Sequence, residues 1–343
     1  MDQLAAAPQS DRSDVFTAAG NMLGLPYVVV EKDFWVCWTL KQLFDDHMVG
    51  TPLIFKGGTS LSKAFGIIER FSEDIDISIH KEALGFSKTN DPQDADISRT
   101  EQDKRVKSLR QAAKDYVRDT ILPRLTTVVA EKLPPPSGDW RLRIDTEASD
   151  VIWFSYPQSL ASAADRTYAY VASEIKLEFG AGSDPYPIGS HLIRPFAADV
   201  VPKAFNEPEC MVTSLEAERT FWEKATLLHA EYHRPEAQST PPRISRHYSD
   251  LARLAQHPLG QSAAADLSLL QRVAAHKAVY FRSGWANYAS AQPGSLRILP
   301  HPSRLQDLRE DYGQMRSMFF TTPPEFGDVI QVLMKLEQTI DGD

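Results

Sequence analysis

Two aspartates inside a short apolar run are the first chemical signal in this sequence. Asp74 and Asp76 belong to the segment DIDISI, in which isoleucines fill the alternate positions. Because successive side chains of a strand point to opposite faces, this alternation predicts a strand that carries both carboxylates on one face. Two such carboxylates repel each other and favour a divalent cation between them. We expect Asp74 and Asp76 to bind Mg²⁺ (or Mn²⁺); a solvated strand face is the alternative.

A glycine-rich segment lies just upstream of the two aspartates. The sequence FKGGTS places Gly57 and Gly58 directly after an apolar run and before two hydroxyl residues, Thr59 and Ser60. Glycines let the backbone approach a ligand closely, and the free N–H groups at the start of a helix attract phosphate. We therefore expect Gly57 to Ser60 to form a phosphate cradle. A simple tight turn is the alternative interpretation.

A third carboxylate is needed to complete a two-metal site for attack on phosphorus. The segment SEIKLEFG alternates like a strand and places Glu178 deep on its polar face. Glu178 is our candidate, and the alternative is a surface glutamate paired with Lys176.

Two polar residues stand out in the second half of the chain. Lys224 is a lone lysine at the centre of an apolar helical segment, and Asp250 follows a basic stretch that contains Arg246 and His247. Their chemistry alone does not separate a functional role from a salt bridge, so both interpretations stay open.

The elements that must position these residues follow from hydrophobic periodicity. We expect a helix over 11–23, a second helix after Pro26 and a short helix over 60–68. The predicted strands cover 52–58, 74–79, 140–145, 151–156 and 171–179. A charged helix is expected over 101–122, and mainly helices follow Thr213, which forms a capping-box pattern with Glu216.

Length and composition limit the classes of protein to consider. The chain has 343 residues, which is enough for two domains, and we place the boundary so that 1–208 is mixed α/β and 209–343 is helical. A net charge of -9 argues against general adhesion to nucleic acid or anionic membranes. The two cysteines match no metal or redox spacing, and no run suggests a signal peptide or a membrane span. We expect a cytoplasmic protein.

An ordered set of motifs resembles a known family. The segments FKGGTSLSKAF, ERFSEDIDISI, IKLEFG, LEAERTFWEKATLLH and RHYSDLARL are similar to successive motifs of the AbiEii/AbiGii nucleotidyltransferase toxins. These are the toxin halves of type IV toxin–antitoxin and abortive-infection systems, which act in phage defence. The resemblance extends from about Val28 to Leu336. It implies an α+β fold, with a polymerase β-like nucleotidyltransferase core in 1–208, built as a mixed sheet with flanking helices, and a helical C-terminal domain.

The same resemblance implies an activity and its partners. A metal-dependent transfer of a nucleotide from an NTP to an acceptor is expected. The 3′ end of tRNA is the expected acceptor, so that the reaction would inhibit translation and growth. A cognate antitoxin is implied as a second partner.

The resemblance also assigns roles residue by residue. It implies a metal site at Asp74, Asp76 and Glu178, where many relatives have Asp at the third position and this chain has the longer glutamate. Lys224 matches the lysine expected at the triphosphate, and Asp250 matches a late motif aspartate that orients Lys224 or contacts the base or ribose. The residues implied in nucleotide binding are Lys56, Gly57, Gly58, Thr59, Ser60, Lys63, Ser72 and Lys224.

Three alternative functions remain at this stage. A glycosyltransferase would also use Asp-x-Asp, but it leaves the upstream glycines and Lys224 unexplained. An NTP-dependent phosphotransferase would move the γ-phosphoryl group instead of the nucleotide. A non-catalytic nucleotide-binding regulatory module would bind without turnover, although all three expected carboxylates are present in the sequence.

Overall fold

The structure of the protein is a computed structural model that describes residues 1–45, 52–72, 74–135, 137–159 and 173–342. The chain divides into two compact units. The first consists of Met1–Ala64, Glu73–Ser87 and Lys107–Ser214, and the second of Phe65–Ser72, Lys88–Val106 and Leu215–Asp343. The predicted division at residue 208 stays a prediction.

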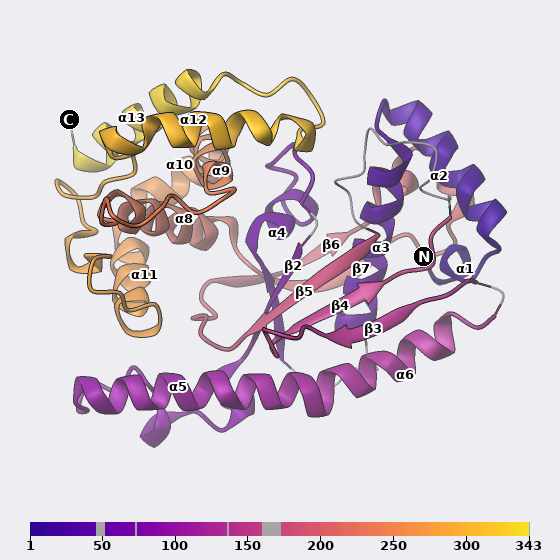
Figure 1. The fold of residues 1–343 in the computed structure, drawn as a ribbon, viewed down its shortest axis with the longest axis horizontal. Coiled ribbons are helices and arrows are strands. Elements are labelled where there is room, and N and C mark those ends of the chain that lie inside the picture. The colour runs from indigo at the N-terminus through magenta and orange to yellow at the C-terminus, as the bar shows by residue number, and fades with distance from the viewer. Residues whose placement is uncertain (46–51, 73, 136, 160–172, 343) are drawn as a thin grey trace. The chain divides into compact units, whose positions relative to one another are not determined.

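The first unit is built on a seven-stranded mixed sheet with the order β3-β4-β5-β2-β1-β7-β6 (Figure 1). The strands are β1 Leu53–Lys56, β2 Asp74–Ile79, β3 Arg141–Ile144, β4 Val151–Ser155, β5 Glu174–Gly180, β6 Ile188–Ile193 and β7 Cys210–Leu215. Strand β2 lies at the centre, antiparallel to β1 and parallel to β5. The central position explains its sequence, because Ile75, Ile77 and Ile79 are completely buried.

Helices of the first unit supply most of its core. They are α1 Asp2–Ala5, α2 Gln9–Leu23, α3 Tyr27–Phe44, α4 Gly57–Lys63, α6 Leu122–Lys132 and α7 Phe196–Val200. Helix α2 ends at Gly24, whose φ of 67° is the left-handed conformation that glycine adopts easily. Helix α3 is buried over nearly all of its length; Trp38 stacks on the ring of Phe154 in β4, and Trp35 packs edge-on against the same ring.

A long helical segment connects the two units along the chain. Helix α5, Arg99–Tyr116, begins in the second unit and continues through a π-helical turn, Val117–Ile121, into α6. The remaining helices belong to the second unit. They are α8 Ala217–Tyr232, α9 Ser245–Gln256, α10 Pro258–Ala265, α11 Leu267–Tyr280, α12 Leu305–Gln314 and α13 Phe326–Asp341.

The predicted strands at 74–79, 140–145, 151–156 and 171–179 are present, although residues 171 and 172 lie outside the described part. The sequence missed β6 and β7. The capping-box interpretation was wrong, because Thr213 lies in β7 and Glu216 occupies the N-cap of α8 without a side-chain capping bond. The short helix begins earlier than predicted, at Gly57, and ends at Lys63.

Candidate active site

The glycine turn between β1 and α4 lies directly against the carboxylate of Asp76. A Cβ atom placed on Gly57 would come within 2.0 Å of Asp76 Oδ2 and 2.8 Å of Asp76 Cγ. The backbone of Gly57 has a φ of 84°, which also disfavours any other residue. The two motifs that the sequence singled out therefore meet in space at one point, and that contact requires glycine.

The expected carboxylates lie on neighbouring central strands. Asp74 and Asp76 are half-buried on one face of β2. Strand register places Glu178 of β5 directly beside Asp76, and places Asp74 beside Lys176. On the other side of β2, Lys56 of β1 is the register partner of Asp76. A row of three charged side chains, Lys56, Asp76 and Glu178, thus crosses three adjacent strands.

Glu178 forms an ion pair with Lys176 on the same face of β5. Burial lowers the pKa of Lys176, but the neighbouring Glu178 outweighs it and the net shift is upward. The surface pairing considered from the sequence is therefore present. Within the described residues, no three His, Cys, Asp or Glu side chains are arranged to hold a metal ion. Metal binding by Asp74, Asp76 and Glu178 stays a prediction.

The two hydroxyl residues of the glycine motif are buried and bonded to backbone carbonyls. Thr59 Oγ1 donates to the carbonyl oxygen of Asp74, which attaches α4 to the first residue of β2. Ser60 Oγ donates to the Gly57 carbonyl at 3.0 Å, inside the helix. In this arrangement the hydroxyls of Thr59 and Ser60 stabilise the turn, and phosphate binding by Gly57 to Ser60 stays a prediction.

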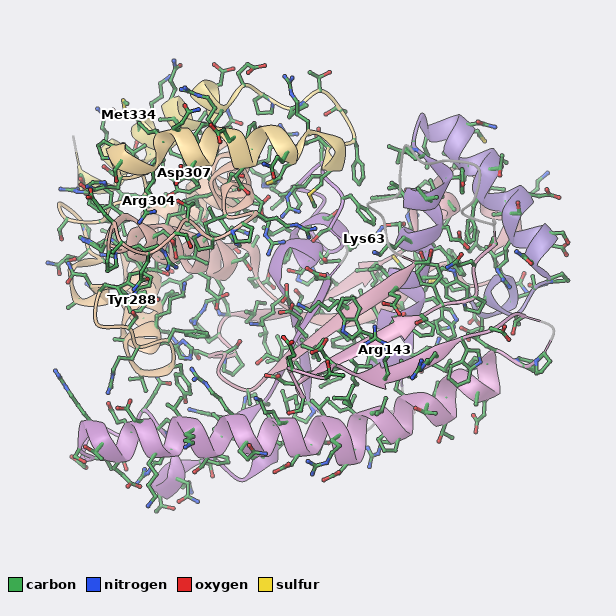
Figure 2. The ribbon with its side chains drawn as sticks, viewed as in Figure 1. Lys63, Arg143, Tyr288, Arg304, Asp307 and Met334 are labelled. Carbon is green, nitrogen blue, oxygen red and sulfur yellow. The ribbon has the colours of Figure 1, made fainter. Side chains whose placement is uncertain are left out.

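Lys63 is held within the core of the first unit. Its Nζ donates to Asp33 Oδ1 at 2.7 Å and lies 3.7 Å from the ring centroid of Phe196, and both ion-pair partners are 5% exposed (Figure 2). Burial lowers the pKa of Lys63, but the charges and hydrogen bonds of Asp33 and Cys37 together outweigh burial, and the net shift of the pKa is upward. The contact joins α3, α4 and α7. Nucleotide binding by Lys63, as by Lys56, stays a prediction.

A buried charged triad occupies the second unit. Asp250 of α9, which is 1% exposed, accepts two hydrogen bonds from Arg70, from Nε to Oδ1 and from Nη2 to Oδ2, both at 2.8 Å. Lys224 of α8 donates to the same Oδ2 at 2.8 Å and also lies 3.4 Å from His247 Nδ1. One carboxylate thus holds two cations, and the triad keeps one net positive charge.

Electrostatics define the protonation state of the triad. Burial raises the pKa of Asp250, but Arg70 and Lys224 outweigh it and hold that pKa far below the ordinary range. Burial lowers the pKa of Lys224, which Asp250 only partly offsets. Burial and the adjacent Lys224 keep the pKa of His247 well below its usual value. Asp250 is therefore ionised and His247 neutral at physiological pH.

Arg70 is the residue that the sequence analysis missed. It precedes Ser72 in the motif ERFSEDID, and its guanidinium is 3% exposed. Its partner stands 180 residues later in the chain, so no local pattern reveals the pair. Ser72 itself is half-buried and ends the same segment, two residues before β2 begins.

The family described as nucleotidyl transferase AbiEii toxin, type IV toxin–antitoxin system, matches residues 38–332. The chain belongs to this family, and it is a nucleotidyltransferase of the toxin class. Both the predicted family and the predicted α+β fold with a nucleotidyltransferase core are confirmed.

One solved structure is similar over nearly the whole length. It is MenT4, a nucleotidyltransferase toxin from Mycobacterium tuberculosis H37Rv, with 15% sequence identity and a TM-score of 0.42, covering 96% of this chain and 97% of that one. No curated protein matches the chain. In the part of the chain that the structure describes, no helix is long and apolar enough to cross a membrane.

Proposed function

We propose that this protein transfers the nucleotidyl group of an NTP to the 3′ end of an RNA, with tRNA as the acceptor, in a reaction that depends on Mg²⁺ or Mn²⁺. The observation that carries the proposal is the contact between the Gly57 turn and Asp76, with Glu178 in register beside it. This arrangement offers backbone groups for phosphate and carboxylates for a cation at one end of the central strands.

The carboxylates of Asp74, Asp76 and Glu178 are the kind of ligand that a divalent cation prefers, and the register of β2 and β5 brings them close together. Asp74 and Asp76 would hold it, and Glu178 would join them once released from Lys176. When bound, such an ion neutralises phosphate charge and makes the acceptor hydroxyl more acidic. In the transfer, the hydroxyl oxygen attacks the α-phosphorus, the bond from that phosphorus to the bridging oxygen breaks, and pyrophosphate leaves with the electron pair.

For Lys224 we propose contact with the β- and γ-phosphates, where its charge would stabilise the leaving pyrophosphate. Its bond to Asp250 supports the orienting role among the two roles considered for that aspartate. Arg70 would keep Asp250 ionised and fixed, so that the triad presents a positive charge in one position. A cognate antitoxin is the expected partner, because the family is a toxin family of type IV systems.

The test uses label transfer to total tRNA. With α-³²P-NTP and Mg²⁺ we expect labelled RNA, whereas γ-³²P-NTP should leave the RNA unlabelled. Label from the γ position alone would instead support a phosphotransferase, and binding without transfer would support a regulatory module. Asp76→Ala should reduce transfer at least about a hundredfold. The matched control, Asp119→Ala, removes an exposed carboxylate paired with Arg118 and should transfer normally.

A further inference from the structure

A cavity of 330 Å³ lies within the second unit, beside the charged triad. Its polar lining includes Arg70, Asp250, Ser249 and Gln256, and its apolar lining includes Phe319 and Val332. Lys224 does not line the cavity, although it binds the same Asp250 oxygen as Arg70. The cavity volume is within the range of small-molecule sites, which is about 300–1,000 Å³.

One wall of the cavity is fixed by backbone pairing. The Phe71 N–H donates to the Met318 carbonyl at 2.6 Å, and the Phe320 N–H donates to the Glu69 carbonyl at 3.1 Å. These two bonds form an antiparallel bridge in which Arg70 lies directly opposite Phe319. Opposed residues in an antiparallel pair extend to the same face. The wall therefore combines a planar cation with an aromatic ring.

The ring of Phe319 packs against a second aromatic side chain of the same unit. Phe319 packs in an edge-to-face contact on Tyr312, with ring centroids 5.8 Å apart. A ring fixed in this way provides a flat surface against which a second planar ring can stack. Val329 and Val332 of α13 supply the facing apolar side.

Charge determines which ligand this cavity can take. The lining holds three carboxylates, of Glu69, Asp250 and Asp328, and two guanidinium groups, of Arg70 and Arg253. Both guanidiniums are already ion-paired, to Asp250 and to Glu69. Because Lys224 binds the same Asp250, the charges at the cavity balance, and the lining offers a phosphate no surplus positive charge. A purely apolar group would cover the polar side chains of Ser249 and Gln256 without offering them a hydrogen bond, which is also unfavourable.

We propose that this cavity binds a nucleobase. An uncharged heteroaromatic ring would stack on Phe319 and present polar edges to Ser249 and Gln256, as proteins recognise unstacked bases. The base comes from the NTP or from the acceptor RNA, since both carry the same chemistry. The proposal rests on the proposed nucleotidyl transfer and adds the site that reads a base.

The first test is direct binding of the four ribonucleosides, measured by equilibrium dialysis without metal or acceptor. Val332→Trp places an indole in the cavity and should weaken nucleoside binding at least tenfold. Gln331→Trp, at the adjacent exposed position outside the lining, is the matched control and should bind like the wild type. Phe319→Leu removes the stacking ring and is a second variant with the same expected loss, and melting curves establish that each variant is folded.

Competition identifies the source of the base. If the base belongs to the NTP, an NTP with Mg²⁺ displaces the bound nucleoside; if it belongs to the acceptor, a short oligoribonucleotide displaces it instead. Absence of nucleoside binding, equal loss in Gln331→Trp, or binding that neither competitor displaces would overturn the proposal. Asp76→Ala should bind nucleosides normally while losing transfer. Nucleoside binding in a wild type that transfers no α-label would refute the proposed function alone.

Discussion

The buried triad predicts that its three members are unequal in their contribution to stability. In Asp250→Asn, Arg70 and Lys224 remain buried with no carboxylate between them. Removing one partner of a buried pair and leaving the other uncompensated costs about 3–5 kcal/mol, and here two cations are left. We expect a loss in the free energy of unfolding at the upper end of that range.

Lys224→Met should cost far less. Asp250 would keep both 2.8 Å bonds from Arg70, so its charge would stay compensated. The substitution removes one charge-assisted hydrogen bond, which costs about 1.5–3 kcal/mol. It also removes the unfavourable burial of an ammonium group, so the net loss in the free energy of unfolding is smaller than the cost of that bond. The difference between the two variants should be at least about 2 kcal/mol.

Urea unfolding followed by tryptophan fluorescence measures both variants, because Trp222 is fully buried in α8, two residues before Lys224. An exposed pair is the control: Asp119→Asn, which loses its contact with Arg118, should change the free energy of unfolding by under about 1 kcal/mol. Both triad variants should transfer less nucleotide, but Lys224→Met should do so while remaining folded. Equal destabilisation by the two triad variants would refute the argument.

Three further predictions follow from single sites. Gly57→Ala should displace the Asp76 carboxylate, because its Cβ would overlap Oδ2, and should lower the transfer rate at least about a hundredfold while the protein stays folded by circular dichroism; a near-normal rate would disprove the contact. Ser72→Glu should be folded but nearly inactive in label transfer, whereas the transfer rate of Ser72→Ala should stay within about tenfold of the wild type. An active glutamate variant would show that Ser72 does not face the site. Burial lowers the pKa of His229 to about 4, so the stability that its neutral ring contributes is complete above pH ~6.5 and is lost as the pH falls towards 4; unfolding measured against pH should show this slope, and His229→Gln should flatten it.

The sequence alone predicted the structure correctly where the pattern of residues is compatible with only one local structure. The alternation of Asp74, Asp76 and the isoleucines specified both the strand and its faces, because an apolar face and paired carboxylates fit only one register. The sequence predicted that Gly57 lets the backbone approach a phosphate, which stays a prediction, and it did not predict a contact of Gly57 with the protein itself. The atom that it approaches, Asp76 Oδ2, became known only from the structure.

The sequence failed where local patterns have two physical origins. Thr213 and Glu216 have capping-box spacing, but the same spacing arises when a strand runs directly into a helix, as β7 runs into α8. Strand β6 was missed because it lies at the edge of the sheet and exposes Ile188 and Leu192, so its apolar residues do not mark a core face. Arg70 escaped because its partner is distant in sequence and an isolated arginine is normally a surface residue.

The path of the chain between the two units has a practical consequence for dissecting the protein. The chain crosses from one unit to the other five times, after Ala64, Ser72, Ser87, Val106 and Ser214. A fragment that begins at Leu215 would therefore contain Asp250 and Lys224 but lack Arg70, as well as the backbone partner of the 318–320 segment. Cutting this toxin at a single peptide bond cannot yield two self-sufficient halves; supplying 65–72 together with the C-terminal fragment is the smallest reconstitution that restores the triad.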